Sequence, residues 1–373
     1  MAASEAIQKI SRLTPLADVQ LMIDAEVKAV TQRTIDVSAG VGRTLAVDAL
    51  APARPAAALA LQDGWAISAD ETLGAGGYAP SPLVRTPSRI EAGQPLPAGT
   101  DSVAPIDTVK VADGLAEALI PINPGDGVLP AGSDSDPAIP FRRAGERLRF
   151  TDLAAFSAAG IARITVREPR IRVIPVRGSG IINAAARLVT ADIDRRGGAA
   201  RLDDSGRGLG VAMAAESADA IVAIGGTGSG RNDNSVQTLA REGRLAVHGI
   251  ALAPGETGAF GFVGIRPVLL LPGRLDAALS VWLVAGRRLL DRLAATKSSE
   301  SEPTETMPLA RKVSSTVGLA EVVPVRRNAG EAEPLATKYL PLSSLARSDG
   351  WILVPANSEG YSAGTSVQVR PWP

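Results

Sequence analysis

The sequence predicts a multidomain protein that combines an α/β domain with two smaller β-rich domains. Between Arg170 and Ala295, strand-like apolar segments alternate with helix-like segments, a pattern typical of a mostly parallel sheet with helices on both faces. From Ala51 to Pro140, proline and glycine recur and no helical period is sustained, which predicts a small β domain with many turns. After Ala310, short strand-like segments separated by Gly and Asn predict a further β domain.

The composition is that of a globular protein and excludes several classes of function. The 373 residues are 45% apolar, and Lys+Arg and Asp+Glu both number 39. A balanced charge without a basic stripe argues against nucleic-acid binding. The chain has no cysteine, which excludes disulfides, thiolate zinc sites and cysteine nucleophiles. We see neither a signal peptide nor an apolar run that could span a membrane, so we expect a cytoplasmic protein.

The first predicted element is a helix over Pro15–Thr31. Its apolar residues Leu16, Val19, Ile23 and Val27 recur at helical spacing. This apolar stripe requires a burial partner, which we expect to be a second copy of the chain.

The remaining elements follow from the same patterns. A helix over Thr151–Ala159 should end at Gly160, because glycine commonly terminates helices. The ranges expected as strands are Ile171–Val176, Ala220–Ile224, Pro267–Leu271, Trp351–Val354 and Ser366–Val369, and those expected as helices are Ala184–Arg196, Ser235–Arg241 and Leu275–Leu293. Lys297–Thr306 is dense in Ser, Glu and Thr and is expected to be a linker.

A glycine-rich loop follows the strand expected at Ala220–Ile224. Its residues are Gly225, Gly226, Thr227, Gly228, Ser229 and Gly230, with Asp233 shortly after. Glycines permit positive φ and close backbone approach, so successive N–H groups can converge on an anion. A loop between strand and helix is also where open α/β sheets bind phosphate-bearing ligands. From the glycines alone, a plain surface turn is an equally good interpretation.

Short motifs spread over nearly the whole chain resemble those of one family in their order and approximate spacing. They are Gln62-Asp-Gly-Trp-Ala-Ile67, Ala92-Gly-Gln-Pro-Leu-Pro-Ala-Gly-Thr-Asp-Ser-Val103, Ala131-Gly-Ser-Asp134, Ala144-Gly-Glu-Arg-Leu148, Ala158-Ala-Gly-Ile161, Leu252-Ala-Pro-Gly255, Ala259-Phe-Gly261, Leu270-Leu-Pro-Gly273, Ser343-Ser-Leu-Ala-Arg-Ser-Asp-Gly350, Leu353-Val-Pro355 and Ser362-Ala-Gly364. The family is that of the molybdopterin molybdenumtransferases, which includes bacterial MoeA and the E domain of gephyrin. The glycine loop itself is also similar to that of the sister molybdopterin adenylyltransferases.

The resemblance implies an elongated homodimer in the cytoplasm, with four domains per chain. We assign residues 1–50 and 141–169 to an N-terminal and linking region, 51–140 to the small β domain, 170–296 to a MogA-like molybdopterin-binding α/β domain and 307–373 to the C-terminal β domain. The implied reaction replaces the adenylyl group on the dithiolate of molybdopterin with molybdate, with Mg²⁺ assisting and AMP leaving. The expected partners are molybdopterin and, if the protein is a carrier, molybdoenzyme apoproteins. The balanced charge and the short apolar runs argue against nucleic acid and membrane as partners.

The resemblance also assigns roles to individual residues. The glycine loop would bind molybdopterin, and Asp233 would contact the pterin or orient the loop, or else cap the next helix. Asp63 and Asp134 would be the catalytic carboxylates that hold Mg²⁺, although Asp63 in an Asp-Gly pair is also typical of a turn. The single histidine, His248, is expected to be structural because no triad accompanies it.

Several positions depart from the family pattern. The family's Thr-Gly-Asp-Glu is replaced by Arg177-Gly-Ser-Gly180, Asp-Ser-Asn by Asn183-Ala-Ala185, Lys-Pro-Gly-Lys-Pro by Ala253-Pro-Gly-Glu-Thr257, and Pro-Gly-Asn-Pro by Pro272-Gly-Arg-Leu275. Glu256 would therefore repel molybdate at a position where the family has a cation.

Arg177, Arg231 and Arg274 could restore positive charge, since guanidinium groups bind oxyanions well. Alternatively, these arginines are solvated surface groups without a role in binding, which is common for arginines beside glycine loops. Two functions remain open: a molybdenumtransferase with weakened activity, and a non-catalytic molybdopterin-binding paralogue that acts as carrier or scaffold.

Overall fold

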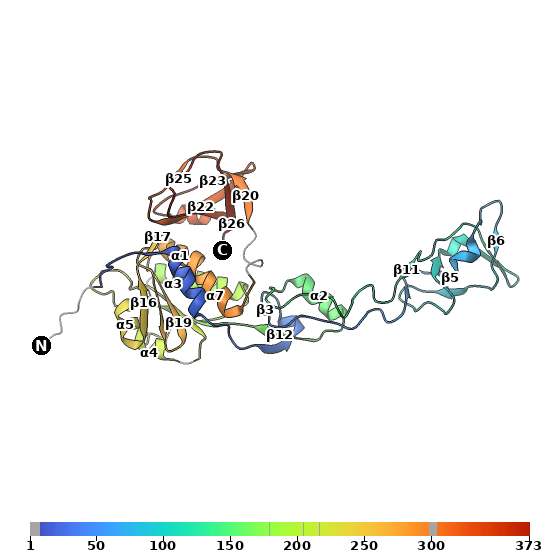
Figure 1. Cartoon of the computed structure of the whole chain (residues 1–373), viewed down its shortest axis with the longest axis horizontal. Helices are drawn as coiled ribbons and strands as arrows, with labels where there is room; N and C mark the ends of the chain where they lie inside the picture. The colour runs from blue at the N-terminus through green and yellow to red at the C-terminus, as the bar shows by residue number, and fades with distance from the viewer. Residues whose placement is uncertain (1–7, 179, 204, 216, 298–303) are drawn as a thin grey trace. The chain divides into compact units, whose positions relative to one another are not determined.

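The computed structural model describes residues 8–178, 180–203, 205–215, 217–297 and 304–373 (Figure 1). The chain forms two compact units. The first unit contains Met1–Val47, Ala144–Phe150 and Arg163–Pro373, and the second contains Asp48–Arg143 and Thr151–Ala162. The boundaries of the four expected domains remain a prediction.

A six-stranded sheet forms the centre of the first unit. Its strand order is β14 (Ala199–Leu202), β13 (Arg170–Pro175), β15 (Ala220–Ile224), β19 (Arg266–Leu271), β18 (Ala259–Val263) and β16 (Arg244–His248). The first four strands are parallel. β18 pairs antiparallel with β19, and β16 pairs antiparallel with β18. The predicted α/β sheet is therefore present, with an antiparallel edge.

Helices cover both faces of this sheet. Val222 and Ile224 of β15 pack on the face covered by α3 (Gly180–Arg195), α6 (Leu275–Val281) and α7 (Arg287–Ala294). Ile221 and Ala223 pack on the opposite face, under α4 (Leu209–Ala214) and α5 (Ser235–Glu242). All five residues of β15 are buried, because side chains alternate across a strand and both sides of this one meet helices. This double burial explains the continuous apolar run in the sequence.

The helix predicted over Leu275–Leu293 is interrupted. Between α6 and α7 lies a π-helical segment, η4 (Trp282–Gly286). Gly286 faces Trp282, and a Cβ atom on Gly286 would lie 2.1 Å from Cε3 of Trp282. The large indole, which is only 1% exposed, thus occupies the space beside the glycine.

The N-terminal helix α1 (Leu16–Glu26) ends earlier than predicted, at Val27. Leu16, Val19, Ile23 and Val27 are all buried, and they belong to the same core as α7 and η4. The expectation that this stripe needs a second copy of the chain is wrong, because the chain's own helices bury it.

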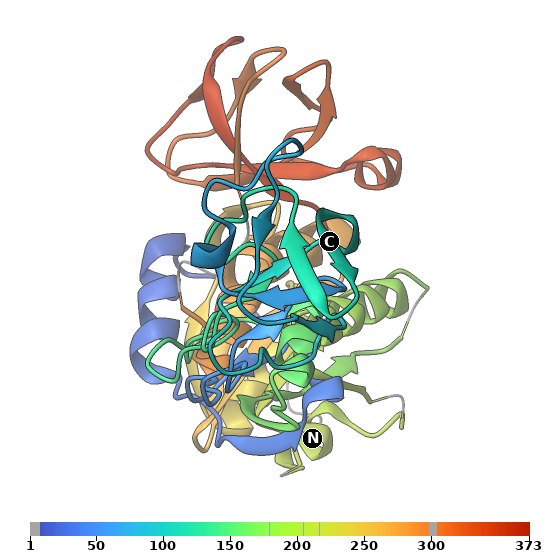
Figure 2. The ribbon, with the colours of Figure 1, turned by 90° about the vertical axis from the view of Figure 1, so that its right-hand side faces the viewer.

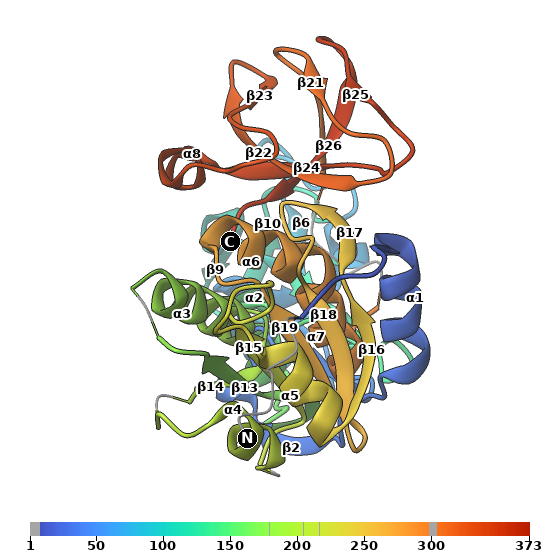
Figure 3. The ribbon, with the colours of Figure 1, turned by 90° about the vertical axis from the view of Figure 1, so that its left-hand side faces the viewer.

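The C-terminal strands extend from the α/β region. β17 (Ile250–Ala253) pairs in parallel with β22 (Ala320–Asn328), and β22 pairs with β24 (Gly350–Val354). β24 pairs in turn with β26 (Ser366–Pro371), and β20 (Glu305–Pro308) forms the edge. In Figure 3, β17 lies between the α/β sheet and these strands. Of the expected linker Lys297–Thr306, residues 298–303 lie outside the described residues, and Glu305 and Thr306 already belong to β20.

The second unit consists of short strands, as the proline- and glycine-rich sequence predicts (blue to teal in Figure 2). One sheet is formed by β7 (Ser88–Ile90), β5 (Gly64–Ile67) and β8 (Ser102–Ala104), and another by β6 (Ser81–Pro82), β10 (Leu115–Ala118) and β9 (Val109–Ala112). A third pair joins β11 (Val128–Leu129) to β4 (Leu59–Ala60). The helix α2 (Phe150–Ala158) also falls largely in this unit and is followed by Gly160 at φ 82°.

Candidate functional site

Three loops meet at the carboxyl ends of the parallel strands. The Val176 N–H donates to the Ile224 carbonyl at 2.9 Å, and the Gly225 N–H donates to the Leu271 carbonyl at 2.8 Å. A Cβ atom on Gly273 would lie 3.6 Å from the Gly225 Cα. The loops that follow β13, β15 and β19 are therefore in contact, at the edge where doubly wound sheets bind their ligands.

The first two glycines of the loop are required by the backbone. Gly225 and Gly226 have φ of 104° and 70°, backbone angles that residues with a Cβ atom rarely adopt. A Cβ on Gly226 would also lie 2.5 Å from Ser235 Oγ. Gly228 is different: its φ is ordinary, and a Cβ there would meet only the Asp233 carboxylate, at 2.8 Å.

Gln8 organises this loop from the N-terminal segment. Its Nε2 donates to the carbonyls of Gly226 at 3.1 Å and Gly228 at 2.7 Å, and its Oε1 accepts from Val236 and Gln237 at the start of α5. Gln8 is 6% exposed. The first-turn amides of α5 are thus occupied by a side chain and are not open to a ligand.

The orientation of the carbonyls fixes that of the amides. In a trans peptide the N–H points opposite to the C=O of the same unit, so the Thr227 and Ser229 N–H groups point away from Gln8. Within the described part of the chain, the amides of Gly226, Thr227, Gly228 and Ser229 donate no hydrogen bond. Four consecutive amides without an internal acceptor are available to hydrogen-bond an anion.

Two further contacts support the loop. Thr227 Oγ1 lies 2.9 Å from Thr257 Oγ1, and the Thr227 carbonyl lies 3.3 Å from His248 Nε2. His248 therefore lies beside the glycine loop, and its structural role remains a prediction. Asp233 is not the helix cap: Asn234 holds that position, and Asp233 Oδ2 accepts from the Gly230 N–H at 3.3 Å. This contact lies within the loop, and the role of Asp233 toward the loop or the pterin remains a prediction.

The three candidate arginines differ in their surroundings. Arg177 is exposed at φ 55° and lines a crevice of about 680 Å³ beyond β13, together with Arg207, Arg241 and Asn234. Arg231 is exposed at the glycine loop. Neither Arg177 nor Arg231 pairs with a carboxylate among the residues that the structure describes.

Arg274, in contrast, has its charge compensated. Its Nε and Nη2 bind Asp276 at 3.1 and 2.6 Å, and its guanidinium lies 5.1 Å from the Tyr339 ring centroid. The hydrogen bond to Asp276 raises the pKa of Arg274, and the negative charge of Glu256 contributes in the same direction. The sequence did not identify Asp276 as the partner of Arg274, although Asp276 stands only two residues further along the chain. It also did not identify Gln8, because no motif near Gln8 indicates a contact with the glycine loop.

The carboxylates expected to hold Mg²⁺ lie in the second unit. Asp63 and Asp134 are both exposed. Asp63 Oδ1 accepts from the Ala92 N–H at 2.9 Å, a contact typical of a turn. The backbone N–H of Asp134 donates to the Arg54 carbonyl. No cluster of three or more His, Asp or Glu side chains that could hold a metal occurs in the described ranges. A dedicated all-protein metal cage is therefore absent from them.

The fold and the loop define a class: an α/β protein with a glycine-rich loop at the carboxyl end of its sheet, the edge where such sheets bind ligands, joined to a C-terminal β region. Three family models match this chain in order: "MoeA N-terminal region (domain I and II)" over residues 1–160, "Probable molybdopterin binding domain" over 197–292 and "MoeA C-terminal region (domain IV)" over 306–372. The chain belongs to the MoeA family, and it is a MoeA-like protein of molybdenum cofactor biosynthesis.

Curated relatives and solved structures agree with this assignment. A protein of Methanocaldococcus jannaschii assigned to molybdopterin biosynthesis is 26% identical, covering 90% of this chain and 91% of the relative. Molybdopterin molybdenumtransferase 1 of Mycobacterium tuberculosis is 27% identical, covering 75% of this chain and 73% of the relative. Two structures of a Pyrococcus horikoshii molybdopterin biosynthesis MoeA protein, at 24% and 20% identity, each cover 97% of this chain and 100% of their own, with TM-scores of 0.78. These structures confirm the fold. Within the described ranges, no helix has the length and apolar character needed to cross a membrane.

Proposed function

We propose that this protein binds molybdopterin through the phosphate of that ligand at the glycine loop and catalyses molybdate insertion only weakly. The observation that carries the binding proposal is the row of four amides from Gly226 to Ser229, which donate to no acceptor in the described ranges. Such a row stabilises a phosphate through several N–H groups at once. Arg177, in the adjoining crevice, adds a cation that can form two parallel hydrogen bonds with an oxyanion.

The charges around the site support the weak-insertion part of the proposal. Insertion brings molybdate beside a phosphate-bearing dithiolate, so the site must supply positive charge. Arg274 is paired with Asp276, and Glu256 stands where the family has a cation. Losing one preorganised electrostatic contact typically lowers a rate about 10²–10³-fold.

Magnesium fits this chain only in a hydrated form. Mg²⁺ commonly binds through one or two carboxylates together with waters and substrate phosphates, and Asp63 and Asp134 are the carboxylates we propose for it. Asp63 keeps one carboxylate oxygen outside its contact with Ala92. An ion held by these carboxylates would supply positive charge that neutralises phosphate oxygens.

The second candidate function is that of a non-catalytic molybdopterin carrier or scaffold for molybdoenzyme apoproteins. The pairing of Arg274 with Asp276 favours it, because that cation is not free for molybdate. In either case we propose that the protein is cytoplasmic and homodimeric.

The test is to incubate the protein with adenylyl-molybdopterin, Mg²⁺ and molybdate and to measure AMP release beside a family member with intact motifs. We expect a rate at least about 10²-fold lower than that of the intact enzyme. Arg177→Ala should lower whatever activity remains, whereas Arg326→Ala, at an exposed arginine of β22, should not. Turnover equal to that of the intact enzyme would refute weak insertion. Absent turnover with retained molybdopterin binding would establish the carrier.

A further inference from the structure

A second arginine-lined cavity lies away from the glycine loop, between the helices of the α/β region and the C-terminal strands. Its volume is about 270 Å³, and its lining includes Arg196 after α3, Arg287 and Arg288 of α7, and Arg370 of β26. Asp291 is the acidic residue in the lining. The cavity therefore carries an excess of positive charge.

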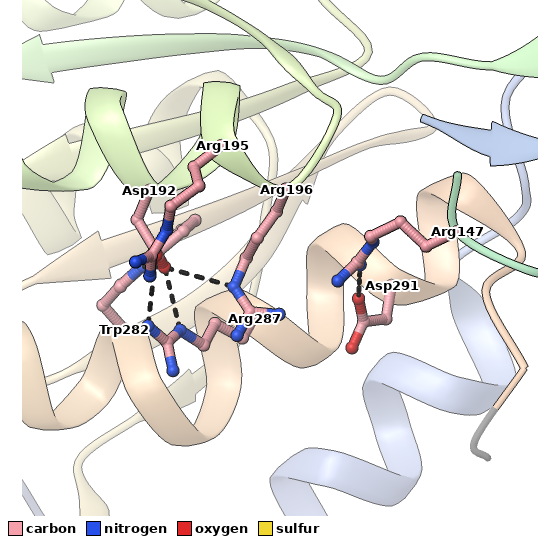
Figure 4. A network of polar contacts seen from close by, with 7 residues as sticks. All are labelled: Arg147, Asp192, Arg195, Arg196, Trp282, Arg287 and Asp291. Carbon is pink, nitrogen blue, oxygen red and sulfur yellow. Dashed lines mark hydrogen bonds and ion pairs between the residues drawn. The ribbon is translucent and has the colours of Figure 1, made fainter. Parts of the chain in front are cut away.

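The network behind the cavity does not remove this excess. One carboxylate, Asp192, binds three arginines: Arg287 at 2.8 and 3.1 Å, Arg195 at 2.7 Å and Arg196 at 3.4 Å (Figure 4). It also accepts from Trp282 Nε1 at 2.8 Å. Arg287 and Arg196 are only 4% and 8% exposed, so solvent screens their charges little.

The other carboxylates nearby are shared as well. Asp291 binds Arg147 at 2.8 Å, and Asp24 binds Arg288. Asp24 also contacts Arg292. With Arg370, seven of the described arginines thus surround these three aspartates. Because burial and the neighbouring Arg287 charge lower the pKa of Arg196 to about 10, the uncompensated positive charge is also felt by the buried arginine itself.

Arg370 completes the cavity from the C-terminal strands. It is half-buried and has no acidic partner among the residues that the structure describes. Its guanidinium lies 4.8 Å from the ring centroid of Trp351, so stacking holds it in place. Trp351 is only 3% exposed, and its indole N–H has no hydrogen-bond partner in the part of the chain that the structure describes.

We propose that this cavity binds a phosphate group, either as inorganic phosphate or on a small phosphomonoester. Arginines recognise phosphate through paired, charge-assisted hydrogen bonds, and a dianion would compensate the excess charge that the network leaves. The site is separate from the glycine loop, because none of the residues that line it belongs to that loop or to its supporting contacts.

The experiment measures inorganic phosphate binding to the full chain by equilibrium dialysis in chloride buffer of matched ionic strength. Gly228→Val serves as the background, so that phosphate at the glycine loop does not contribute. We expect saturable binding of one phosphate per chain, weakened at least about tenfold by Arg370→Gln, the effect of losing roughly one charged hydrogen bond. Arg326→Gln should leave binding unchanged.

Arg288→Gln is the second variant, because this side chain is 42% exposed and its replacement disturbs no core. It should also weaken binding, and circular dichroism should show both variants folded. If AMP competes with inorganic phosphate, the cavity accepts a phosphate group on a phosphomonoester. If AMP does not compete, the ligand is free phosphate. Binding that survives both Arg370→Gln and Arg288→Gln, or the absence of saturable binding up to about 10 mM phosphate, would overturn the proposal.

Discussion

Gln8 and Gly228 show at the residue scale how the glycine loop is shaped. Gln8 holds the carbonyls of Gly226 and Gly228 and the first amides of α5, so the Thr227 and Ser229 amides point to the other side. The orientation of these two amides thus depends on a side chain more than 200 residues away in sequence. A Cβ on Gly228 would meet only the end of the flexible Asp233 side chain. We therefore expect a replacement there to cost the contact of Asp233 with Gly230 and to leave the fold intact.

Gly228→Val should weaken molybdopterin binding at least about tenfold, because a branched side chain would fill the approach to the amides. The loop buries little core, so the melting temperature should change little. Calorimetric titration with molybdopterin measures the affinity. Gly264→Val, in a turn with open space around its Cβ position, is the control and should bind molybdopterin as the wild type does. Because Gly264 has φ of 61°, that control tests affinity and not stability. Unchanged affinity in Gly228→Val would remove the loop from the binding site.

Asp192 is the second residue whose chemistry can be tested alone. Burial raises the pKa of its carboxyl, but the hydrogen bond and charge of Arg287, with Arg196 and Trp282, lower it to about 2. Because the pKa in the folded state lies below the unfolded value near 3.9, this stabilisation is present above about pH 4. It is lost as the pH falls from about 4 to 2.

Asp192→Asn should lower the free energy of unfolding at pH 7 by about 3–5 kcal/mol, because it leaves buried arginines without their counter-charge. Between about pH 4 and 2, the wild type should lose roughly 2 kcal/mol more stability than the variant. Urea denaturation across this pH range measures both effects. Asp194→Asn, on the exposed side of the same helix, is the control, since asparagine keeps the oxygen that accepts from the Ala200 N–H. Equal losses of unfolding free energy in Asp192→Asn and Asp194→Asn would contradict a stabilising role for the arginine network around Asp192.

The segment α6–η4–α7 illustrates the element scale. Its apolar period predicts one helix, and the backbone does continue from Leu275 to Ala294. The π-helical turn arises where Trp282 and Gly286 meet, a contact that side-chain periodicity does not encode. Such local widenings of helices lie outside what an apolar pattern can predict.

Gly286→Ala should destabilise the protein, although alanine is the better helix former by about 1 kcal/mol. Its Cβ would lie 2.1 Å from the Trp282 ring, and overpacking a buried site typically costs about 1–3 kcal/mol. We therefore expect a lower denaturation midpoint. Gly180→Ala, at the start of α3 with open space around it, should be neutral or slightly stabilising. A raised midpoint for Gly286→Ala would show that the indole moves without cost.

At the scale of the whole molecule, the oligomeric state rests on the family alone. The apolar stripe of α1 is buried by α7 and η4, so it supplies no surface for a partner. Family membership still leads us to predict a homodimer in solution. Light scattering across micromolar concentrations should show about twice the 38.3 kDa monomer mass; a mass near the monomer value would contradict the prediction.

Several features of this protein followed from the sequence by itself. The buried strand at Ala220–Ile224, the helices on both sides of the sheet, the short-stranded second unit and the family itself all follow from local pattern and motif order. They do so because apolar periodicity and turn residues act over a few neighbouring positions.

Only the tertiary structure decided which residues, distant in sequence, compensate each other's charges or hold each other's groups in place by hydrogen bonds. It pairs Arg274 with Asp276 and places Leu340 N–H on the same carboxylate. It also brings Gln8 to the glycine loop and Arg370 to the helices that carry Arg287 and Arg288. Charge compensation and hydrogen bonding depend on distances in space. Positions far apart in the chain therefore carry no local signal of these contacts.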